Sequence, residues 1–303
     1  MDIRNNAPAL WLRRLAIALV IALIAAGAPL AGFGKAQAAR LPLNIAVEVG
    51  FDGKMKNDRW FPVKLTITNP GDDLSGDVTV RTTGDGGRSV VYAKHVDLPR
   101  QSTKIVWFAL PGKSYNKNNN IVEFFENSVE KGKAVPFAGG EVSIDARPLS
   151  PETLLVGVAA RDPDTLNFLS LLGQRGAPVQ TVALPGDDFP WEAGMLDALD
   201  VIAFNDKPGD ALKAEQAKQI ETWAEKGGQL VLAGGAGYAK TASPFDVISP
   251  VSVSGTGSVT ALSEFVQASG KELKLDEPFT VSKATVKTGD TLFAENGLPL
   301  VVS

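Results

Sequence analysis

Polar and glycine residues that could bind a ligand follow three apolar segments of the sequence, and we expect them to meet in one crevice. In a parallel sheet covered by helices, ligands bind beyond the carboxyl ends of the strands. A guanidinium group, two carboxylates, an amide and a glycine turn would offer both charged and neutral hydrogen-bonding partners there. The candidate ligand-binding residues are Arg161 and Asp162, Asn205 and Asp206, and Gly234, Gly235 and Gly237.

The same residues also have structural interpretations, which the sequence leaves open. Asp162 precedes Pro163, and an aspartate followed by a proline is typical of a helix N-terminus. Asn205 and Asp206 suit a turn that ends a strand. An ion pair between Arg161 and Asp206 that is shielded from water in a concave site would favour binding. Two exposed side chains on a flat surface would favour a scaffold.

The sequence lacks the nucleophiles and metal ligands of many enzymes. It contains no cysteine and a single histidine, His95. This composition excludes disulfides, thiolate metal sites, cysteine nucleophiles and any metal site that needs two histidines. No catalytic motif surrounds His95 in the sequence, so we expect a half-exposed histidine on a strand. The sequence therefore predicts no catalytic residue, no cofactor and no metal ion.

Glycine and acidic clusters could serve phosphate binding or acid–base catalysis, but their context disfavours both. Gly235 and Gly237 follow a predicted strand, as in half of a dinucleotide fingerprint. The third glycine is absent, and Tyr238–Pro244 does not have the pattern of a helix that opens toward an anion. The acidic pairs at 72–73 and 187–188 lie in predicted loops, where such residues usually form solvated turns. The formal net charge of −4 gives no general attraction to nucleic acid.

Two strands and a helix organise the second half of the chain. Asp200–Phe204 and Gln229–Ala233 are short segments rich in apolar and β-branched residues. Between them, apolar residues recur at helical spacing, and glycines at 227 and 228 end the pattern. A strand, a helix and a strand at this length predict a parallel βαβ unit. The apolar helix positions are Ala217, Ile220, Trp223 and Ala224.

A second unit of the same kind precedes the first in sequence. Leu154–Ala160 and Val179–Leu184 are predicted strands, and between them a helix opens at Pro163 and ends at Gly173 and Gly176. Its expected buried stripe is Leu166, Leu169 and Leu172. The order of elements predicts a doubly wound α/β domain of flavodoxin-like type over residues 154–303.

The last part of the chain has a weaker signal. Strands are expected at Phe279–Val286 and Leu298–Val302 within segments rich in glycine, serine and threonine. The chain ends on the second of these apolar segments, with nothing after it to cover the strand. We therefore expect this domain to be truncated at its C-terminus.

In the first half of the chain, apolar and polar residues alternate with a period of two. Val63, Leu65 and Ile67 alternate with polar residues, the pattern of a strand with one buried face. Turn sequences separate seven such segments, which predict an all-β immunoglobulin-like sandwich over residues 39–147, followed by a linker at 148–153. Besides the strand through Val63, the expected strands are Leu43–Val49, Asp77–Thr82, Ser89–His95, Lys104–Leu110, Ile121–Glu126 and Glu141–Asp145.

The N-terminus has the pattern of a secretory signal peptide over residues 1–38. Arginines at 4, 13 and 14 precede an uncharged apolar run from Leu15 to Ala28, and Ala36 and Ala38 form a small-x-small cleavage motif. The run is shorter than the ~20 residues that span a bilayer. We expect cleavage after Ala38 and a mature chain outside the cytoplasm, while an uncleaved anchor or a buried helix stays open.

Two stretches resemble a family of bacterial cell-envelope proteins common in Gram-positive genomes. They are VEVGFDGKMKNDRWFPVKLTITNPGDDLSG, which begins at Val47, and the stretch from LDALDVIAFND to GGQLVLAGGAG, which ends at Gly237. In that family an immunoglobulin-like domain precedes a domain similar to class I glutamine amidotransferases. The resemblance implies a membrane-anchored protein with its bulk outside the cell and with hydrophobic segments beyond residue 303.

An active amidotransferase uses a cysteine nucleophile on a sharp turn and a histidine base. The turn from Gly234 to Gly237 carries no Cys, Ser or Thr, so the sequence excludes this chemistry. It predicts instead a non-catalytic ectodomain that binds, scaffolds or senses, with an envelope protein or a saccharide as partner, contact with the membrane, and no nucleic acid. The alternative is a hydrolase or transferase of the envelope that uses the crevice at the strand ends.

Overall fold

The computed structural model describes residues 40–83, 87–114, 120–173, 177–184, 189–206 and 212–303. The predicted signal sequence with Ala36 and Ala38 lies outside these residues, as do the acidic pair at 187–188 and Gly176. Residues 42–303 form one compact unit. Among the described residues, no helix has both the length and the apolar character needed to cross a membrane.

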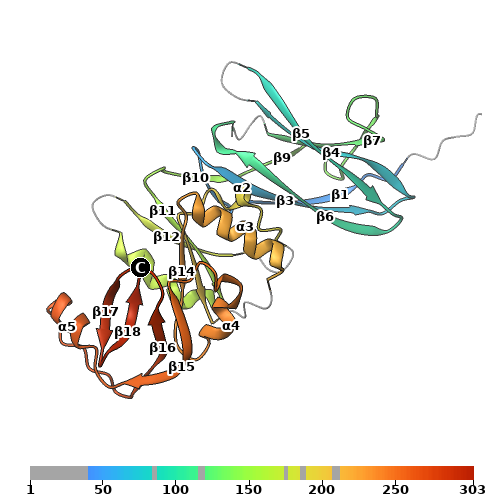
Figure 1. Cartoon of the computed structure of the whole chain (residues 1–303). Helices are drawn as coiled ribbons and strands as arrows, with labels where there is room; N and C mark the ends of the chain where they lie inside the picture. Colours follow the sequence, from blue (N-terminus) through green and yellow to red (C-terminus); the bar gives the residue numbers. More distant parts are fainter. Residues whose placement is uncertain (1–39, 84–86, 115–119, 174–176, 185–188, 207–211) are drawn as a thin grey trace, which may run out of the picture. The chain divides into compact units, whose positions relative to one another are not determined.

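An antiparallel β-sandwich forms the first part of this unit, as the alternating sequence pattern predicts (Figure 1). One sheet has the strand order β1-β3-β6, and the other has the order β5-β4-β7-β8, with β9 also paired to β7. The strands are β1 (Asn44–Val49), β3 (Trp60–Asn69), β4 (Leu74–Thr83), β5 (Ser89–Leu98), β6 (Ser102–Pro111), β7 (Ile121–Glu126), β8 (Ala134–Val135) and β9 (Val142–Ser143). A short 3₁₀ turn, η1 (Gly112–Ser114), follows β6.

Strand β3 shows how the sequence pattern produces a sheet with one buried face. Val63, Leu65 and Ile67 are fully buried, whereas Lys64 and Thr66 between them are only partly covered. Burial of each such aliphatic side chain stabilises the fold by about 1.5–3 kcal/mol. Because a slip of one residue would expose all three, the alternation also fixes the register with β1 and β6.

The segment predicted as a linker begins inside a strand. β2 (Lys54–Lys56) and β10 (Arg147–Leu149) pair in parallel, so residues 148 and 149 lie in a two-stranded sheet. The backbone N–H of Arg147 donates to the carbonyl of Gly53 over 2.7 Å. Prolines at 148 and 151 indicated a break in structure, but a proline is tolerated at a sheet edge where its missing N–H is not needed.

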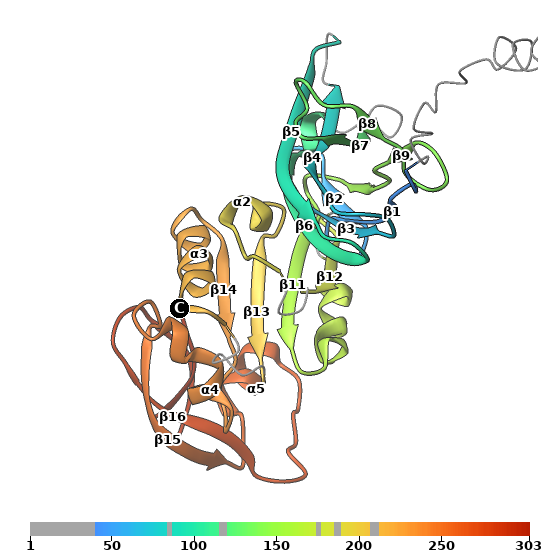
Figure 2. The same cartoon turned by 90° about the vertical axis from the view of Figure 1, so that its right-hand side faces the viewer.

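A four-stranded parallel sheet follows, with the order β12-β11-β13-β14 (Figure 2). All three strand pairings are parallel, as predicted for two βαβ units. The helical turn α2 (Ala193–Leu196) precedes β13, and α3 (Ala214–Glu225) connects β13 to β14 and ends before Gly227, whose φ is 104°. The strands are β11 (Leu154–Ala160), β12 (Val179–Ala183), β13 (Val201–Asn205) and β14 (Gln229–Leu232).

Both faces of the parallel sheet are covered by apolar side chains. On one face, Ile202 and Phe204 of β13 belong to the same buried cluster as Ile220 and Trp223 of α3. On the other face, Val156, Val158 and Ala203 form a smaller cluster under the 3₁₀ segment η2 (Pro163–Leu172). Two-sided burial explains why β11 and β13 are continuously apolar in sequence.

The predicted buried stripe of the first helix is wrong in part. η2 is a 3₁₀ helix, and none of its residues is buried. Leu166 and Leu169 are half-buried against the smaller cluster, but 53% of Leu172 is exposed. In a 3₁₀ helix, residues three apart line up in a single row. That row packs on the smaller cluster through Leu166 and Leu169, whereas Leu172 at its end is not among the residues packed there.

The C-terminal part contains two hairpins, of which the sequence predicted one strand each. Strands at Phe279–Val286 and Leu298–Val302 are confirmed, whereas their partners and the short helices were missed. The partner strand of the first hairpin reads VSVSGTGSV, where glycine and serine mask the apolar alternation. The elements are α4 (Tyr238–Ala242), η4 (Ser243–Phe245), β15 (Val251–Val259), α5 (Ser263–Ser269), β16 (Phe279–Val286), β17 (Thr291–Glu295) and β18 (Leu298–Val302).

Tyr238–Ala242 and Ser243–Phe245 form two short helical turns that the sequence pattern did not predict. The helical turns form because they bury Tyr238, Ala242 and Phe245 against the sheet. The hydroxyl of Tyr238 also lies 2.6 Å from the hydroxyl of Ser249. Tertiary burial outweighs the weak local helix signal of this segment.

A continuous row of aromatic rings joins the sandwich to the parallel sheet. Phe51 and Trp107 of the sandwich both make edge contacts with Phe189, at centroid distances of 6.1 and 5.1 Å. Phe189 contacts Trp191, which stacks on Phe204 of β13. These residues belong to one buried cluster, so the two β-rich parts share a hydrophobic core. Rings packed in this way contribute beyond their buried area.

Candidate functional site

Two of the predicted crevice residues, Arg161 and Asp206, meet at the carboxyl ends of the parallel strands. Ala160, which ends β11, is the register partner of Asn205, which ends β13. This brings Nε of Arg161 to 3.4 Å from Oδ2 of Asp206. The side chains of this pair are 73% and 62% exposed, so the pair is formed but not desolvated. Such an exposed ion pair contributes at most about 1 kcal/mol and by itself marks no binding pocket.

The neighbouring polar residues have local structural partners. Oδ1 of Asp162 accepts a hydrogen bond of 3.1 Å from the backbone N–H of Asp164, which is the predicted N-cap. Asn205 Nδ2 donates to Thr165 Oγ1 over 3.5 Å. Asp206 adopts a positive φ of 49°, consistent with the predicted turn at the end of β13.

The glycine turn after β14 is bonded to a residue that sequence reasoning missed. Ser282 of β16 accepts a hydrogen bond of 2.8 Å from the backbone N–H of Gly235 and lies 3.3 Å from the carbonyl oxygen of the same glycine. Ser282 is about nine-tenths buried. No sequence signal links it to the turn, because it lies on a separate hairpin 47 residues away.

Two of the glycines also make close approaches that a side chain would disturb. A Cβ atom on Gly234 would lie 3.3 Å from Oγ of Ser282, and one on Gly237 would lie 3.3 Å from Oδ1 of Asp206. Gly235 has a φ of 86°, which favours glycine. The turn therefore packs between Asp206 and Ser282 within the fold.

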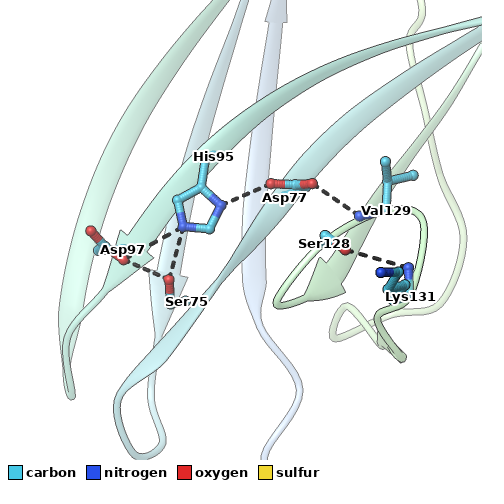
Figure 3. Close-up of polar contacts among 7 residues, drawn as sticks. All are labelled: Ser75, Asp77, His95, Asp97, Ser128, Val129 and Lys131. Atoms are coloured by element: carbon cyan, nitrogen blue, oxygen red, sulfur yellow. Dashed lines mark hydrogen bonds and ion pairs between the residues drawn. The ribbon is translucent and has the colours of Figure 1, made fainter.

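A second polar cluster lies on the sandwich, around the single histidine (Figure 3). Nδ1 of His95 lies 2.9 Å from Oδ1 of Asp77, and Nε2 lies 3.0 Å from Oγ of Ser75. The hydroxyl of Ser75 also donates to Oδ1 of Asp97 over 2.6 Å. His95 is thus a half-exposed histidine on β5, as expected, and it has polar partners that no sequence motif announced.

Strand register produces this cluster. Asp77 pairs directly with His95, and Ser75 pairs with Asp97, in the antiparallel ladder of β4 and β5. Side chains two residues apart on a strand share a face, so all four lie on one face of the hairpin. Ser-x-Asp and His-x-Asp stand at equal distances on either side of the β4–β5 turn, and this signal could have revealed the pairing.

Asp77 is the least exposed member of the cluster. Its Oδ2 accepts a hydrogen bond of 2.9 Å from the backbone N–H of Val129. This bond, followed by the contact with His95, lowers the pKa of the Asp77 carboxyl below its ordinary value, although partial burial acts in the opposite direction. Asp77 is therefore a fixed anion that orients the imidazole through Nδ1.

The connectivity of Ser75, His95 and Asp77 matches that of a serine hydrolase, but the surroundings differ. Ser75 lies in a regular strand that is paired on both sides, not on a sharp turn that presents a serine to backbone N–H donors. Its hydroxyl also donates to a second carboxylate, Asp97. This arrangement suits proton exchange among surface groups better than nucleophilic attack.

Two hollows of the surface lie away from the glycine turn. A cleft of about 920 Å³ is lined by residues of both β-rich parts, including Trp60, Asp197, Asp200 and Gln229. Another of about 420 Å³ lies beside His95 and Asp97. In the part of the chain that the structure describes, no three His, Cys, Asp or Glu side chains gather as a metal site.

Comparison with known proteins identifies only part of the chain. Residues 42–145 match a family described as a domain of unknown function, DUF8726. No curated protein sequence matches the chain.

Among solved structures, the CARDB domain of the PF1109 protein from Pyrococcus furiosus, in complex with di-metal ions, is 11% identical over 35% of this chain and 87% of its own, with a TM-score of 0.26. A β-glucosidase from Listeria innocua in complex with glucose is 17% identical over 35% of this chain and 16% of its own, with a TM-score of 0.21. A cycloisomaltooligosaccharide glucanotransferase from Paenibacillus sp. is 13% identical over 62% of this chain and 27% of its own, with a TM-score of 0.23. Scores this low carry no inference about activity.

Proposed function

We propose that the chain is a non-catalytic protein of the bacterial cell envelope that binds or scaffolds outside the cytoplasm, and that its parallel-sheet part is an inactive amidotransferase-like domain. One contact carries this proposal: Ser282 occupies both the N–H and the carbonyl of Gly235. In an active domain of this type, the corresponding turn would hold the nucleophile. Here the turn carries no nucleophile, and the Gly235 N–H is already paired within the fold.

The strand order supports the flavodoxin-like assignment. Along the chain, the four parallel strands are β11, β12, β13 and β14, and in space their order is β12-β11-β13-β14. A second-first-third-fourth order is the beginning of the flavodoxin-like arrangement. This topology is shared by many unrelated activities and so supports the fold without naming a reaction.

The envelope location rests on the N-terminal sequence. Its arginines, short apolar run and Ala36-x-Ala38 motif are those of an exported protein, and the resemblance to envelope proteins agrees. We propose an envelope protein or a saccharide as the partner and contact with the membrane through the N-terminal apolar run or a further segment.

The alternative function is a hydrolase or transferase that uses the strand-end crevice. Its support is the ion pair of Arg161 and Asp206, which lies at the strand ends and is open to solvent. Turnover of an envelope glycan or ester that disappears in Asp206→Ala, with the fold intact, would favour this alternative and overturn the non-catalytic proposal.

Location and binding can be tested separately. The full-length chain, produced in a bacterium that secretes it, should react with an amine reagent that does not cross membranes, whereas a cytoplasmic control protein should not. The purified chain should then co-sediment with cell walls, or crosslink to one envelope protein. A chain that stays unlabelled in intact cells would contradict the location. Chemical conversion of the bound partner by the chain would contradict the non-catalytic role.

A further inference from the structure

The single proton of the Ser75 hydroxyl has two competing partners. Its oxygen lies 3.0 Å from Nε2 of His95 and 2.6 Å from Oδ1 of Asp97 (Figure 3). A carboxylate can only accept, and a hydroxyl donates only one hydrogen bond. If the proton points to Asp97, then Nε2 must donate to the hydroxyl oxygen instead of accepting from it.

The protonation state of His95 decides between these two arrangements. Nδ1 faces Oδ1 of Asp77 at 2.9 Å, and Asp77 is an anion, so Nδ1 carries a proton in either state. When Nε2 also carries a proton, an uninterrupted row of hydrogen bonds runs from Asp77 through His95 and Ser75 to Asp97. When Nε2 has none, it becomes an acceptor and competes with Asp97 for the Ser75 proton.

We propose that Asp77, His95, Ser75 and Asp97 form a proton-operated switch on the exposed face of the β4–β5 hairpin. One proton taken from water onto Nε2 of His95 turns the Ser75 hydroxyl toward Asp97. Loss of that proton turns the hydroxyl back to the imidazole, and the Asp97 carboxylate then loses its hydrogen bond from Ser75. No covalent bond other than N–H changes, and the net charge of the face changes by one. This inference does not depend on the proposed function.

Two fixed points make the row a switch rather than a loose surface cluster. The backbone N–H of Val129 anchors Asp77, which has only 15% of its side chain exposed. The cross-strand pairs set the spacing of all four side chains. The lowered pKa of Asp77 supports the same assignment, because an anion next to Nδ1 keeps that nitrogen protonated.

The other charged groups near His95 lie in the hollow beside it and on the loop that holds Asp77. The hollow beside it is also lined by Lys94 and Lys104, which are basic, and by Glu192, which is acidic. Lys94 is directed over the ring of Phe108 at 5.7 Å. On the loop that holds Asp77, Glu130 and Lys131 are adjacent and opposite in charge. Phe125, which pairs with Asp77 from β7, adds no charge. The contacts to His95 therefore come from the row itself.

Nuclear magnetic resonance of the full-length chain tests the switch directly. His95 is the only histidine, so its labelled ring signals need no assignment. We expect the chemical shift of the Asp97 carboxyl carbon, followed against pH, to show an inflection at the same pH as the His95 ring signals. In the neutral state of the ring, Nε2 should be the unprotonated nitrogen. Ser75→Ala should reduce the Asp97 inflection, and Ser75→Thr, which keeps the hydroxyl, should retain it.

The matched control is Asp72, an exposed carboxylate in the turn before β4 that does not contact His95. Its carbon should not follow the histidine titration, and Asp72→Asn should leave the Asp97 response unchanged. The proposal is overturned if Asp97 shows no inflection with His95, if Ser75→Ala leaves that inflection at full size, or if Nδ1 is the unprotonated nitrogen. Signals of the amide backbone confirm that each variant is folded.

Discussion

The ammonium group of Lys56 in β2 lies 2.6 Å from Oδ2 of Asp200, which directly precedes β13 of the parallel sheet. Only 3% of the Lys56 side chain is exposed, compared with 27% for Asp200. The same carboxylate oxygen accepts a hydrogen bond of 2.7 Å from the backbone N–H of Leu155. One anion therefore anchors both a buried lysine from β2 and the first residues of β11.

Removal of this anion should destabilise the whole unit. Asp200→Ala leaves the Lys56 ammonium buried without its counter-ion, and we expect a loss of about 3 kcal/mol in the free energy of unfolding, at the lower end for broken buried pairs because Asp200 is partly exposed. Urea unfolding followed by tryptophan fluorescence measures it. The double variant Lys56→Met/Asp200→Ala should recover part of the loss. Equal stability of Asp200→Ala and the native chain would contradict the assignment.

Asp77 should make stability depend on pH in acid. Its folded-state pKa is lowered, so its contribution is present above the unfolded value near 3.8 and is lost as pH falls through the folded-state pKa. Asp77→Asn should therefore be less stable than the native chain at pH 7, by about 1–2 kcal/mol for lost charged hydrogen bonds. The two curves should converge in strong acid. Asp72→Asn serves as the control, and a difference that persists unchanged at low pH would refute the linkage.

Ser282 should stabilise the glycine turn. Ser282→Ala leaves the N–H of Gly235 without this partner in a partly buried position, and we expect a loss of about 1–2 kcal/mol. Ser254→Ala is the matched control on the same hairpin, because its hydroxyl is exposed and makes one bond of 3.3 Å to the carbonyl of Lys283. The control should change stability by less than about 0.5 kcal/mol. Thermal unfolding of both variants gives the comparison.

Gly228 should not tolerate a side chain. An added Cβ would lie 2.3 Å from the ring of Trp223, which is buried in the core, so the ring must move. Gly228→Ala should cost about 1–3 kcal/mol, as overpacking does. Gly255→Ala, which meets nothing within 4 Å, should be neutral or slightly stabilising. If both variants unfold at the same urea concentration, the close approach is not significant.

Exposed charges at the strand ends should contribute little to folding. Asp206→Ala removes a solvated ion pair with Arg161, and the free energy of unfolding should change by less than about 1 kcal/mol. Circular dichroism during thermal unfolding can measure this. Because the fold survives, the variant is suitable for the turnover and binding experiments above. A large loss of stability would show that the pair has a structural role that its exposure does not suggest.

The sequence was informative in β3 and α3, where one periodic pattern specified burial. Alternation in β3 and the helical spacing of Ile220 and Trp223 predicted elements that the structure confirms. Register followed as well, because a one-residue slip would expose a whole apolar face. The strand-end residues Arg161 and Asp206 were correctly expected to meet, because parallel strands end at a common edge.

Tertiary structure decided the contacts between distant segments, which a periodic sequence pattern does not encode. Ser282 reaches Gly235 from a distant hairpin, and His95 acquires Asp77 and Ser75 through strand pairing. Tyr238–Ala242 becomes helical because its side chains are buried, against a weak local propensity. Sequence alone thus determined the β-sandwich, the parallel units and the lack of a cysteine nucleophile. Which polar groups are paired, buried or free depended on contacts between segments far apart in the chain, since those contacts set the hydrogen-bond partners and the local solvent exposure.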